Sequence, residues 1–256
     1  RTLATLAATG QPGTPIQNNY DPFIPGFTYA EYNNLQSFID ACDEDTIAVM
    51  VEPVQGEGGV IPATKEFLQG LRKLCDEKGM LLLFDEVQTG WGRTGELMGF
   101  MTYDVKPDCV SMAKAMGGGM PIGAMCTSAK LALTFGPGAH GSTYAGNPVC
   151  CAASYAQISE IIEEKLADNA KEVGAYFMEK LKSIPDVKEV RGKGLMIGVE
   201  FNSNIANDVK YNSADEGLLM TAVRPAVIRF VPPLNVTRDD CDKAWEILNK
   251  VVSELV

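Results

Sequence analysis

The sequence predicts an α/β protein: a large domain on a mainly parallel sheet, followed by a small carboxyl-terminal α+β domain. Three observations support this prediction. An apolar run at 47–51, an amphipathic segment at 64–78 and an apolar run at 80–84 follow the strand–helix–strand order of parallel sheets. Another apolar run at 109–112 extends the same sheet. The last third of the chain instead reads as strands and helices without this alternation.

The amino-terminal elements can be taken in order. Residues 1–17 predict a short helix that leads into a loop, and 32–42 carry apolar side chains at helical spacing. The segment from Thr64 to Lys78 predicts a strong amphipathic helix, and Gly79 supplies its carboxyl-terminal stop.

The carboxyl-terminal part begins with an almost continuous helical pattern at 148–183, with a break expected near 166–169. Strands are expected within 187–201 and 226–234, a short helix at 215–219 and a final helix at 238–255. We place the domain boundary near Lys165, so that residues 1–164 form the large domain and 165–256 the small one.

Composition limits the possible functions. The chain has 33 acidic and 22 basic residues, a formal net charge of −11, which argues against nucleic acid or an anionic membrane as partner. No apolar run reaches membrane length. A single histidine argues against a histidine triad, and we expect no metal site. Seven scattered cysteines predict reduced thiols and a cytoplasmic location.

An acid and a lysine follow two strands of the predicted sheet. Asp85 ends the run at 80–84, and Lys114 lies just after the run at 109–112 and just before three glycines. Ligands of open α/β sheets bind beyond the carboxyl ends of the strands, so both side chains are expected in one crevice. Pyridoxal phosphate needs a lysine that forms a Schiff base and an acid beside its ring nitrogen. For an isolated pair, a capped strand end and a surface lysine would remain the alternative.

Strand alternation assigns further contacts. Asp85 and Val87 share one face of the strand, while Glu86 belongs to the other. We expect Val87 to lie beneath the cofactor ring and Gln88 to reach its phenolic oxygen. Glu86 is counted with the same contact run, although its side chain is expected to point away.

The full wording of these segments is more specific. FDEVQTGWGRTG, followed by SMAKAMGGGMPIGAM, closely resembles the class III (subgroup II) aminotransferases of the fold-type I pyridoxal phosphate family. The match runs over nearly the whole chain and is greatest to the acetylornithine aminotransferase group. The resemblance implies that Lys114 is the Schiff-base lysine and that Asp85 pairs with the pyridine nitrogen. It also implies that Val87 and Gln88 contact the ring.

The resemblance also implies substrate contacts. Arg1 falls on the arginine that grips the substrate α-carboxylate, a task that suits the planar guanidinium fork. Glu57 falls on the acid that pairs with a distant arginine and opens for the second substrate's carboxylate. Arg229 lies in an apolar strand and needs a partner, for which Glu57 is the expected acid. A buried ion pair with another acid stays the alternative.

Small hydroxyl residues precede Asn147 and Pro148, at the start of the predicted long helix. By sequence alone they read first as a capping cluster, although a helix amino terminus also suits phosphate. In the resembling family Thr143 binds the cofactor phosphate and Ser142 contacts substrate, both across a subunit boundary. The resemblance therefore implies a homodimer with shared active sites.

The implied reaction transfers an amino group from N-acetylornithine to 2-oxoglutarate, which yields N-acetylglutamate semialdehyde and glutamate in arginine biosynthesis. Ornithine, 4-aminobutyrate and succinyl-diaminopimelate remain alternative donors. A non-catalytic fragment is the alternative from another class, because the family's amino-terminal phosphate loop and stacking aromatic have no match in these residues. A Rossmann dehydrogenase would need a dinucleotide fingerprint that the sequence lacks.

Overall fold

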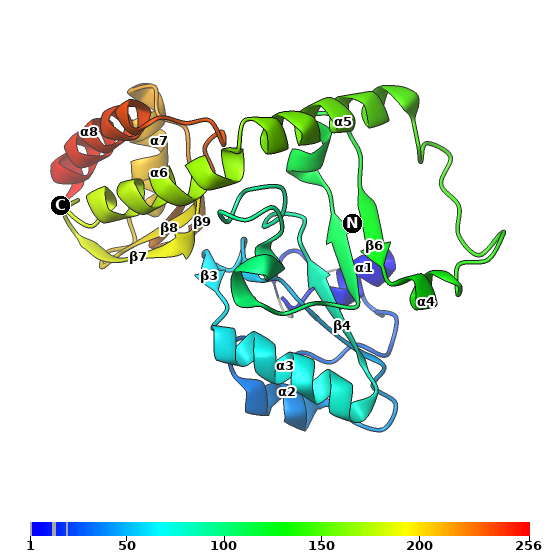
Figure 1. Cartoon of the computed structure of the whole chain (residues 1–256). Coiled ribbons are helices and arrows are strands. Elements are labelled where there is room, and N and C mark those ends of the chain that lie inside the picture. The colour runs from blue at the N-terminus through cyan, green and yellow to red at the C-terminus, as the bar shows by residue number, and fades with distance from the viewer. Residues whose placement is uncertain (1, 12–13, 19) are drawn as a thin grey trace.

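Two separate sheets organise the chain in the computed structural model, which describes residues 2–11, 14–18 and 20–256 (Figure 1). The large sheet has the order β1-β4-β5-β6. Its strands are β1 (Ala48–Val51), β4 (Leu81–Asp85), β5 (Cys109–Met112) and β6 (Ala124–Thr127). The first three run parallel and β6 pairs antiparallel to β5. The predicted parallel sheet is therefore confirmed, with one antiparallel edge strand.

The helix between the first two parallel strands forms as the sequence predicts. It is α3 (Lys65–Lys78), which begins after Thr64 and ends at Gly79 in the left-handed conformation that glycine tolerates best. Its apolar face packs on the large sheet beside α2 (Leu35–Ala41). The core that results contains Leu68, Leu71, Leu82 and Phe84 among its least exposed side chains.

Two long helices lead from the large sheet to the small one. They are α5 (Pro148–Glu163), at the top of the view in Figure 1, and α6 (Leu166–Leu181), which continues from it to the left below α7 and α8. The break falls at residues 164–165, slightly before the predicted position, and Lys165 has a φ of 51°. Because each sheet has its own core, we propose a division into domains 1–164 and 165–256 at this break.

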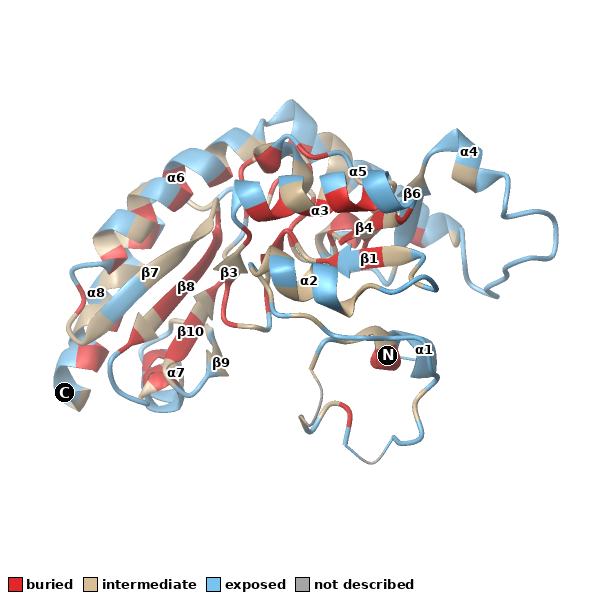
Figure 2. Ribbon diagram, turned by 90° about the horizontal axis from the view of Figure 1, so that it is seen from below, coloured by how far each residue is buried: buried red, intermediate tan, exposed pale blue. Residues whose placement is uncertain are grey.

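The small sheet has the order β7-β8-β10-β9 and is entirely antiparallel. Its strands are β7 (Val187–Lys193), β8 (Met196–Phe201), β9 (Thr221–Arg224) and β10 (Val227–Phe230). Helices α6, α7 (Ala206–Asp215) and α8 (Arg238–Leu255) enclose its core. Figure 2 shows the buried residues on β8 and on one side of α6. The final helix has its predicted bounds, but a helix at 215–219 was the wrong expectation, because α7 ends at Asp215.

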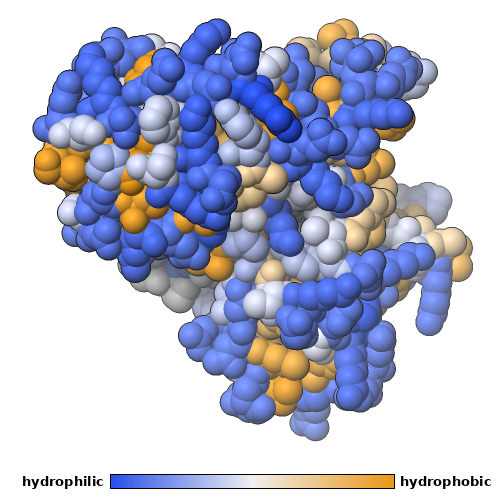
Figure 3. All heavy atoms as spheres, turned by 60° about the vertical axis from the view of Figure 1, so that its left-hand side comes forward, coloured by the Kyte–Doolittle hydropathy of each residue, from blue (hydrophilic) through white to orange (hydrophobic). Residues whose placement is uncertain are grey.

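Short elements complete the chain. They are α1 (Leu3–Ala8), β2 (Val54–Gln55), β3 (Ile61–Pro62), α4 (Ala129–Ala132) and the 3₁₀ turns η1 (Gly99–Tyr103) and η2 (Lys114–Gly117). On the face in Figure 3, hydrophilic side chains dominate and hydrophobic ones form small separate patches. Within the described ranges, none of the helices combines the length and apolar character needed to cross a membrane.

Candidate active site

Asp85 occupies the carboxyl end of the large sheet. It stands opposite Ser111 in the β4–β5 pairing. Its Oδ1 accepts the backbone N–H of Val87 at 2.9 Å and the Ser111 hydroxyl at 3.2 Å. Both hydrogen bonds fix the carboxylate through one oxygen, Oδ1, which leaves Oδ2 available to a cationic partner. Sequence analysis overlooked Ser111, whose place opposite Asp85 depends on the strand register.

Lys114 follows β5 by one residue and starts η2 with a φ of 47°. This left-handed backbone is unusual for a residue with a Cβ and is typical of functional sites. Partial burial lowers the pKa of the Lys114 amine. The charge of Glu57 opposes that shift, whereas the charge of Arg229 adds to it. The structure therefore brings Lys114 into the electrostatic range of the predicted substrate residues.

Glu57, Gln88 and Arg229 form one hydrogen-bonded group. The Nη1 atom of Arg229 lies 2.7 Å from Oε1 of Glu57, and the amide of Gln88 donates to the same oxygen at 3.0 Å. Arg229 is 11% exposed and Glu57 46%. Burial would raise the pKa of Glu57, but these hydrogen bonds outweigh burial and hold that pKa below its usual value. Arg229 thus has the expected partner, one that solvent and ligands can reach.

Glu52 is a titratable residue that sequence analysis overlooked. It directly follows β1 and its Oε2 accepts the N–H of Gly56 at 3.1 Å. Burial raises the pKa of Glu52 to about 7, and the charges of Asp85 and Glu57 add to the rise. The rule that pointed to Asp85, an acid at the end of a parallel strand, would also have found it.

The expectation for Glu86 as a cofactor contact was wrong. Its fully buried carboxylate accepts the Thr89 hydroxyl at 2.5 Å and the N–H groups of Gly99 and Phe100 at 2.8 and 2.7 Å. The side chain therefore faces away from Asp85, as strand alternation implies, and anchors the start of η1. Both of its oxygens accept hydrogen bonds inside the core, so the carboxylate does not face the candidate site.

Strand alternation does not extend to the next two residues. Strand β4 ends at Asp85, so Val87 and Gln88 lie in a turn that begins with the Asp85–Val87 hydrogen bond. Gln88 reaches Glu57 from this turn, across Gly56. A Cβ built at Gly56 would lie 2.4 Å from the Gln88 amide oxygen, so a larger residue there would displace the Gln88 side chain.

The remaining predicted site residues lie away from Asp85 and Lys114 or outside the residues that the structure describes. Ser142 and Thr143 are exposed in the segment between α4 and α5, which projects from the body of the chain in Figure 1. Asn147, not Ser142 or Thr143, caps α5, through its Oδ1 and the N–H groups of Val149 and Cys150. Arg1 lies outside the described residues.

The donor set suits an aldehyde cofactor with a basic ring better than a metal. In the described ranges, no group of three or more His, Cys, Asp or Glu side chains is placed to hold a metal ion. The free oxygen of Asp85 can pair with a protonated ring nitrogen, and Lys114 offers an amine for the aldehyde. Among the described residues, the buried Nε of Arg229 has no hydrogen-bond partner.

Comparison with known proteins agrees with this chemistry. The family model "Aminotransferase class-III" matches residues 1–252. Acetylornithine aminotransferase from Caldanaerobacter subterraneus is 42% identical over 259 residues, which cover 100% of this chain and 65% of the relative. The enzyme of the same name from Gloeobacter violaceus is 44% identical, with 100% and 64% covered. The chain thus spans about 65% of the length of these relatives.

Solved structures are similar over the same extent. Ornithine aminotransferase from Toxoplasma gondii, a structure with partial occupancy of PLP at its active site, gives a TM-score of 0.92 at 35% identity. That match covers 99% of this chain and 61% of the other. N-acetylornithine aminotransferase from Stenotrophomonas maltophilia gives 0.82 at 35% identity, with 91% and 64% covered. The predicted fold-type I α/β architecture is confirmed, and the chain belongs to the class-III aminotransferase family.

Proposed function

We propose that this chain supplies the catalytic lysine and the dicarboxylate-binding arginine of a pyridoxal phosphate-dependent aminotransferase. Its preferred amino donor is N-acetylornithine and its acceptor is 2-oxoglutarate. The observation that carries the proposal is the convergence of Asp85, Lys114 and the Glu57–Arg229 pair at the carboxyl edge of the large sheet. The 41–44% identity to several acetylornithine aminotransferases supports the choice of donor.

When bound, pyridoxal phosphate supplies an aldehyde for the amines of lysine and substrate, and a ring that accepts electrons from the substrate carbon. Asp85 would hold the ring nitrogen through its free oxygen. The lowered pKa of Lys114 increases the fraction of neutral amine near neutral pH. That amine can take the proton from the substrate carbon that carries the amino group and later return it.

The Glu57–Arg229 pair lets one site accept two kinds of substrate. With the pair closed, Glu57 occupies Arg229, so Arg229 is not presented to the far end of a donor such as N-acetylornithine. When glutamate or 2-oxoglutarate enters, its side-chain carboxylate replaces Glu57 on Arg229. Arginine suits this exchange because its planar fork binds either carboxylate in two-point geometry.

The remaining assignments are part of the same proposal. Arg1 would bind the substrate α-carboxylate, and Val87 would lie against the cofactor ring. Ser142 and Thr143 would serve the site of a second subunit in a homodimer, and their exposure supports this role. Apolar side chains nearby are also exposed, such as Tyr144 at 82% and Leu133 at 85%. Seven free cysteines are consistent with a reducing, cytoplasmic location.

Two alternatives are kept for specific reasons. An ornithine, 4-aminobutyrate or succinyl-diaminopimelate donor is possible within the family, and the similarity to ornithine aminotransferase structures favours the first of these. A chain that is not catalytic is the other, and cofactor capture tests it.

Cofactor capture separates catalysis from the fragment reading. The purified chain is mixed with pyridoxal phosphate, reduced with borohydride and digested. We expect the mass of the reduced cofactor on the peptide that contains Lys114, and no such mass with Lys114→Ala. Lys130→Ala, an exposed lysine on α4, is the matched control. A chain that stays colourless and unlabelled with added cofactor would favour the non-catalytic fragment.

A further inference from the structure

The loop that carries Glu57 has an unusual backbone. It connects β2 to β3, and its last residue, Val60, is fully buried with a φ of 54°. A β-branched residue rarely adopts this left-handed conformation, because its side chain crowds the backbone. The packing around the loop must therefore maintain its shape.

The small sheet presents a matching row of three residues to this loop. Arg191 on β7 and Arg229 on β10 both stand opposite Gly198 on β8, so their side chains project from the same face. They are two strand spacings apart, roughly 10 Å. Gly198 leaves a slot between them, which the loop fills. A Cβ built at Gly198 would lie 2.9 Å from the Val60 Cβ and 3.1 Å from the Gly59 oxygen.

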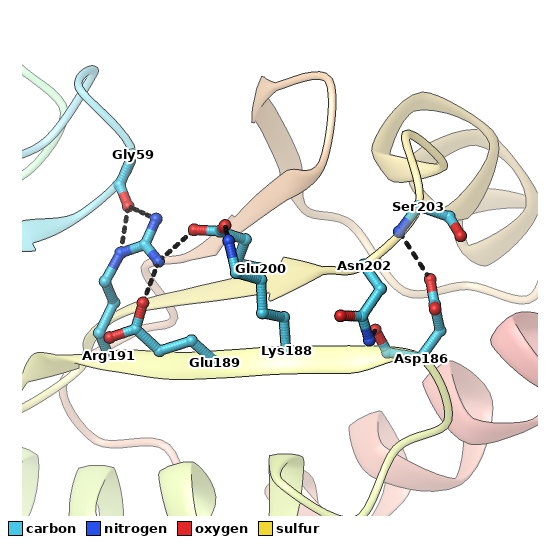
Figure 4. A network of polar contacts seen from close by, with 8 residues as sticks. All are labelled: Gly59, Asp186, Lys188, Glu189, Arg191, Glu200, Asn202 and Ser203. Atoms are coloured by element: carbon cyan, nitrogen blue, oxygen red, sulfur yellow. Dashed lines mark hydrogen bonds and ion pairs between the residues drawn. The ribbon is translucent and has the colours of Figure 1, made fainter.

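Arg191 holds the loop by its backbone. Its Nη2 and Nε atoms donate to the Gly59 carbonyl at 2.9 and 3.1 Å, and Nε also lies 3.2 Å from the Val60 carbonyl. The opposite corner of the guanidinium, Nη1, pairs with Glu200 at 2.6 Å and Glu189 at 2.7 Å (Figure 4). With 14% of its side chain exposed, Arg191 is largely buried. Two acids thus orient a fork that grips two successive carbonyls.

We propose that Arg191 is a positioning residue for Glu57, acting through the loop backbone. With residues 59 and 60 clamped to one end of the row, the Glu57 carboxylate is kept over Arg229 at the other end. Glu57 then competes with any carboxylate that approaches Arg229, and substrate entry needs only a side-chain movement. The inference rests on the proposed function, in which Arg229 binds a dicarboxylic keto acid.

The clamp predicts a direction that a purely structural role does not. If Arg191 no longer holds the loop, Glu57 competes less well for Arg229, so the affinity of Arg229 for a dicarboxylate should increase. Loss of packing alone would reduce the affinity for every ligand. The effect must also disappear when Glu57 has already been neutralised, since Arg191 acts only through that residue.

Calorimetric titration with glutarate, a non-reacting dicarboxylate, tests the clamp in the pyridoxal phosphate-loaded chain. We expect Arg191→Gln to lower the Kd for glutarate by roughly fivefold, the lower end of typical coupling between sites. Glu57→Gln should lower it at least as much, and the double variant should bind no more tightly than Glu57→Gln alone. Lys188→Gln is the matched control, because Lys188 pairs with Glu200 but does not touch the loop. Its Kd should equal that of the parent.

Contrary outcomes are distinguishable. If Arg191→Gln weakens glutarate binding, leaves it unchanged, or still changes it in the Glu57→Gln background, the clamp is wrong. If the parent and Arg229→Gln bind glutarate equally, the dicarboxylate site itself is wrong, and the clamp falls with it. Should Arg191→Gln fail to fold, Arg191→Lys keeps the charge beside Glu189 and Glu200 but loses the fork. Arg191→Lys must then lower the Kd for glutarate, by a smaller factor than that expected for Arg191→Gln. Otherwise the clamp is wrong.

Discussion

Three carboxylates lie near one another at the candidate site, and they differ in burial and in hydrogen-bond partners. Glu57 is half exposed and paired with Arg229, which keeps it ionised. Asp85 is held through one oxygen by two hydrogen-bond donors. Glu52 is largely buried and accepts one backbone N–H, so its charged form is poorly stabilised. A proton held on Glu52 reduces its repulsion with the neighbouring Asp85 and Glu57.

The raised pKa of Glu52 predicts a pH-dependent stability. The folded chain keeps the Glu52 proton up to a pKa of about 7, whereas the unfolded chain loses it near the ordinary glutamate pKa of 4.5. Between these values the folded state binds more protons, so stability is fully present below the unfolded pKa and falls as pH rises toward 7. The loss amounts to at most about 3 kcal/mol.

Urea denaturation of the cofactor-free chain at pH 5 and pH 8 measures this contribution. We expect Glu52→Gln to be more stable than the parent at pH 8, by about 1–3 kcal/mol, and close to it at pH 5. The amide keeps an acceptor for the Gly56 N–H and cannot ionise. Glu66→Gln, on the exposed first turn of α3, is the control and should not change the difference between the two pH values. Equal pH dependence in the parent and Glu52→Gln would contradict the assignment.

At the scale of single elements, helix α3 shows how a local signal fixes a boundary. Thr64 precedes the helix, and its hydroxyl accepts the N–H of Phe67 at 3.1 Å. Thr64→Ala removes this cap and should destabilise the chain by about 1 kcal/mol, whereas Thr64→Ser should retain most of the stability. Urea midpoints of the three proteins check this. An alanine variant as stable as the parent would mean that packing on the large sheet alone sets the start of α3.

The elements that the sequence predicted well carry such local signals. Apolar runs predicted β5 and nearly all of β4, and a capping box marks the start of α8. The expected helix at 215–219 failed because its few apolar residues do not repeat at helical spacing. The helix that does form, α7, lies just before this segment. Its buried positions are mostly small or polar, so it carries no clear apolar pattern. Helix α7 owes its place to packing on α8 and β9, which no local pattern reveals.

The same distinction applies to the site. The shared edge of Asp85 and Lys114 could be predicted, because Asp85 ends one recognisable strand, Lys114 follows the next, and parallel strands end at the same edge of a sheet. Glu86 was assigned with its neighbours in sequence, although the pleat turns it into the core. The row of Arg191, Gly198 and Arg229 could not be predicted, because it depends on the register of three antiparallel strands.

Over the whole molecule, several arginines of the described residues connect the small sheet to the rest of the chain. Arg191 and Arg229 reach from the small sheet to the loop at 57–60. Arg93 reaches in the opposite direction, from the loop after β4 to the carbonyls of Pro232 at 2.6 Å and Leu195 at 3.2 Å. Burial lowers the pKa of Arg93 to about 10, which still leaves it charged at neutral pH. Backbone carbonyls accept its hydrogen bonds, and within the part of the chain that the structure describes no acid forms an ion pair with it.

Arg93→Met therefore tests whether the two domains unfold together. It removes both hydrogen bonds while preserving most of the volume, which should cost roughly 2 kcal/mol of coupling.

The two tryptophans report separately: Trp245 belongs to the small-domain core, and Trp91 packs at the junction against Ile161 and Leu234. Trp91→Phe leaves Trp245 as the fluorescent reporter, and Trp245→Phe leaves Trp91. In the parent background, we expect the fluorescence of these two variants to give one shared urea midpoint. In the Arg93→Met background, the Trp91 signal should change at lower urea than the Trp245 signal. Coincident midpoints in both backgrounds would show that apolar packing around Leu195 and Leu234, and not Arg93, couples the domains.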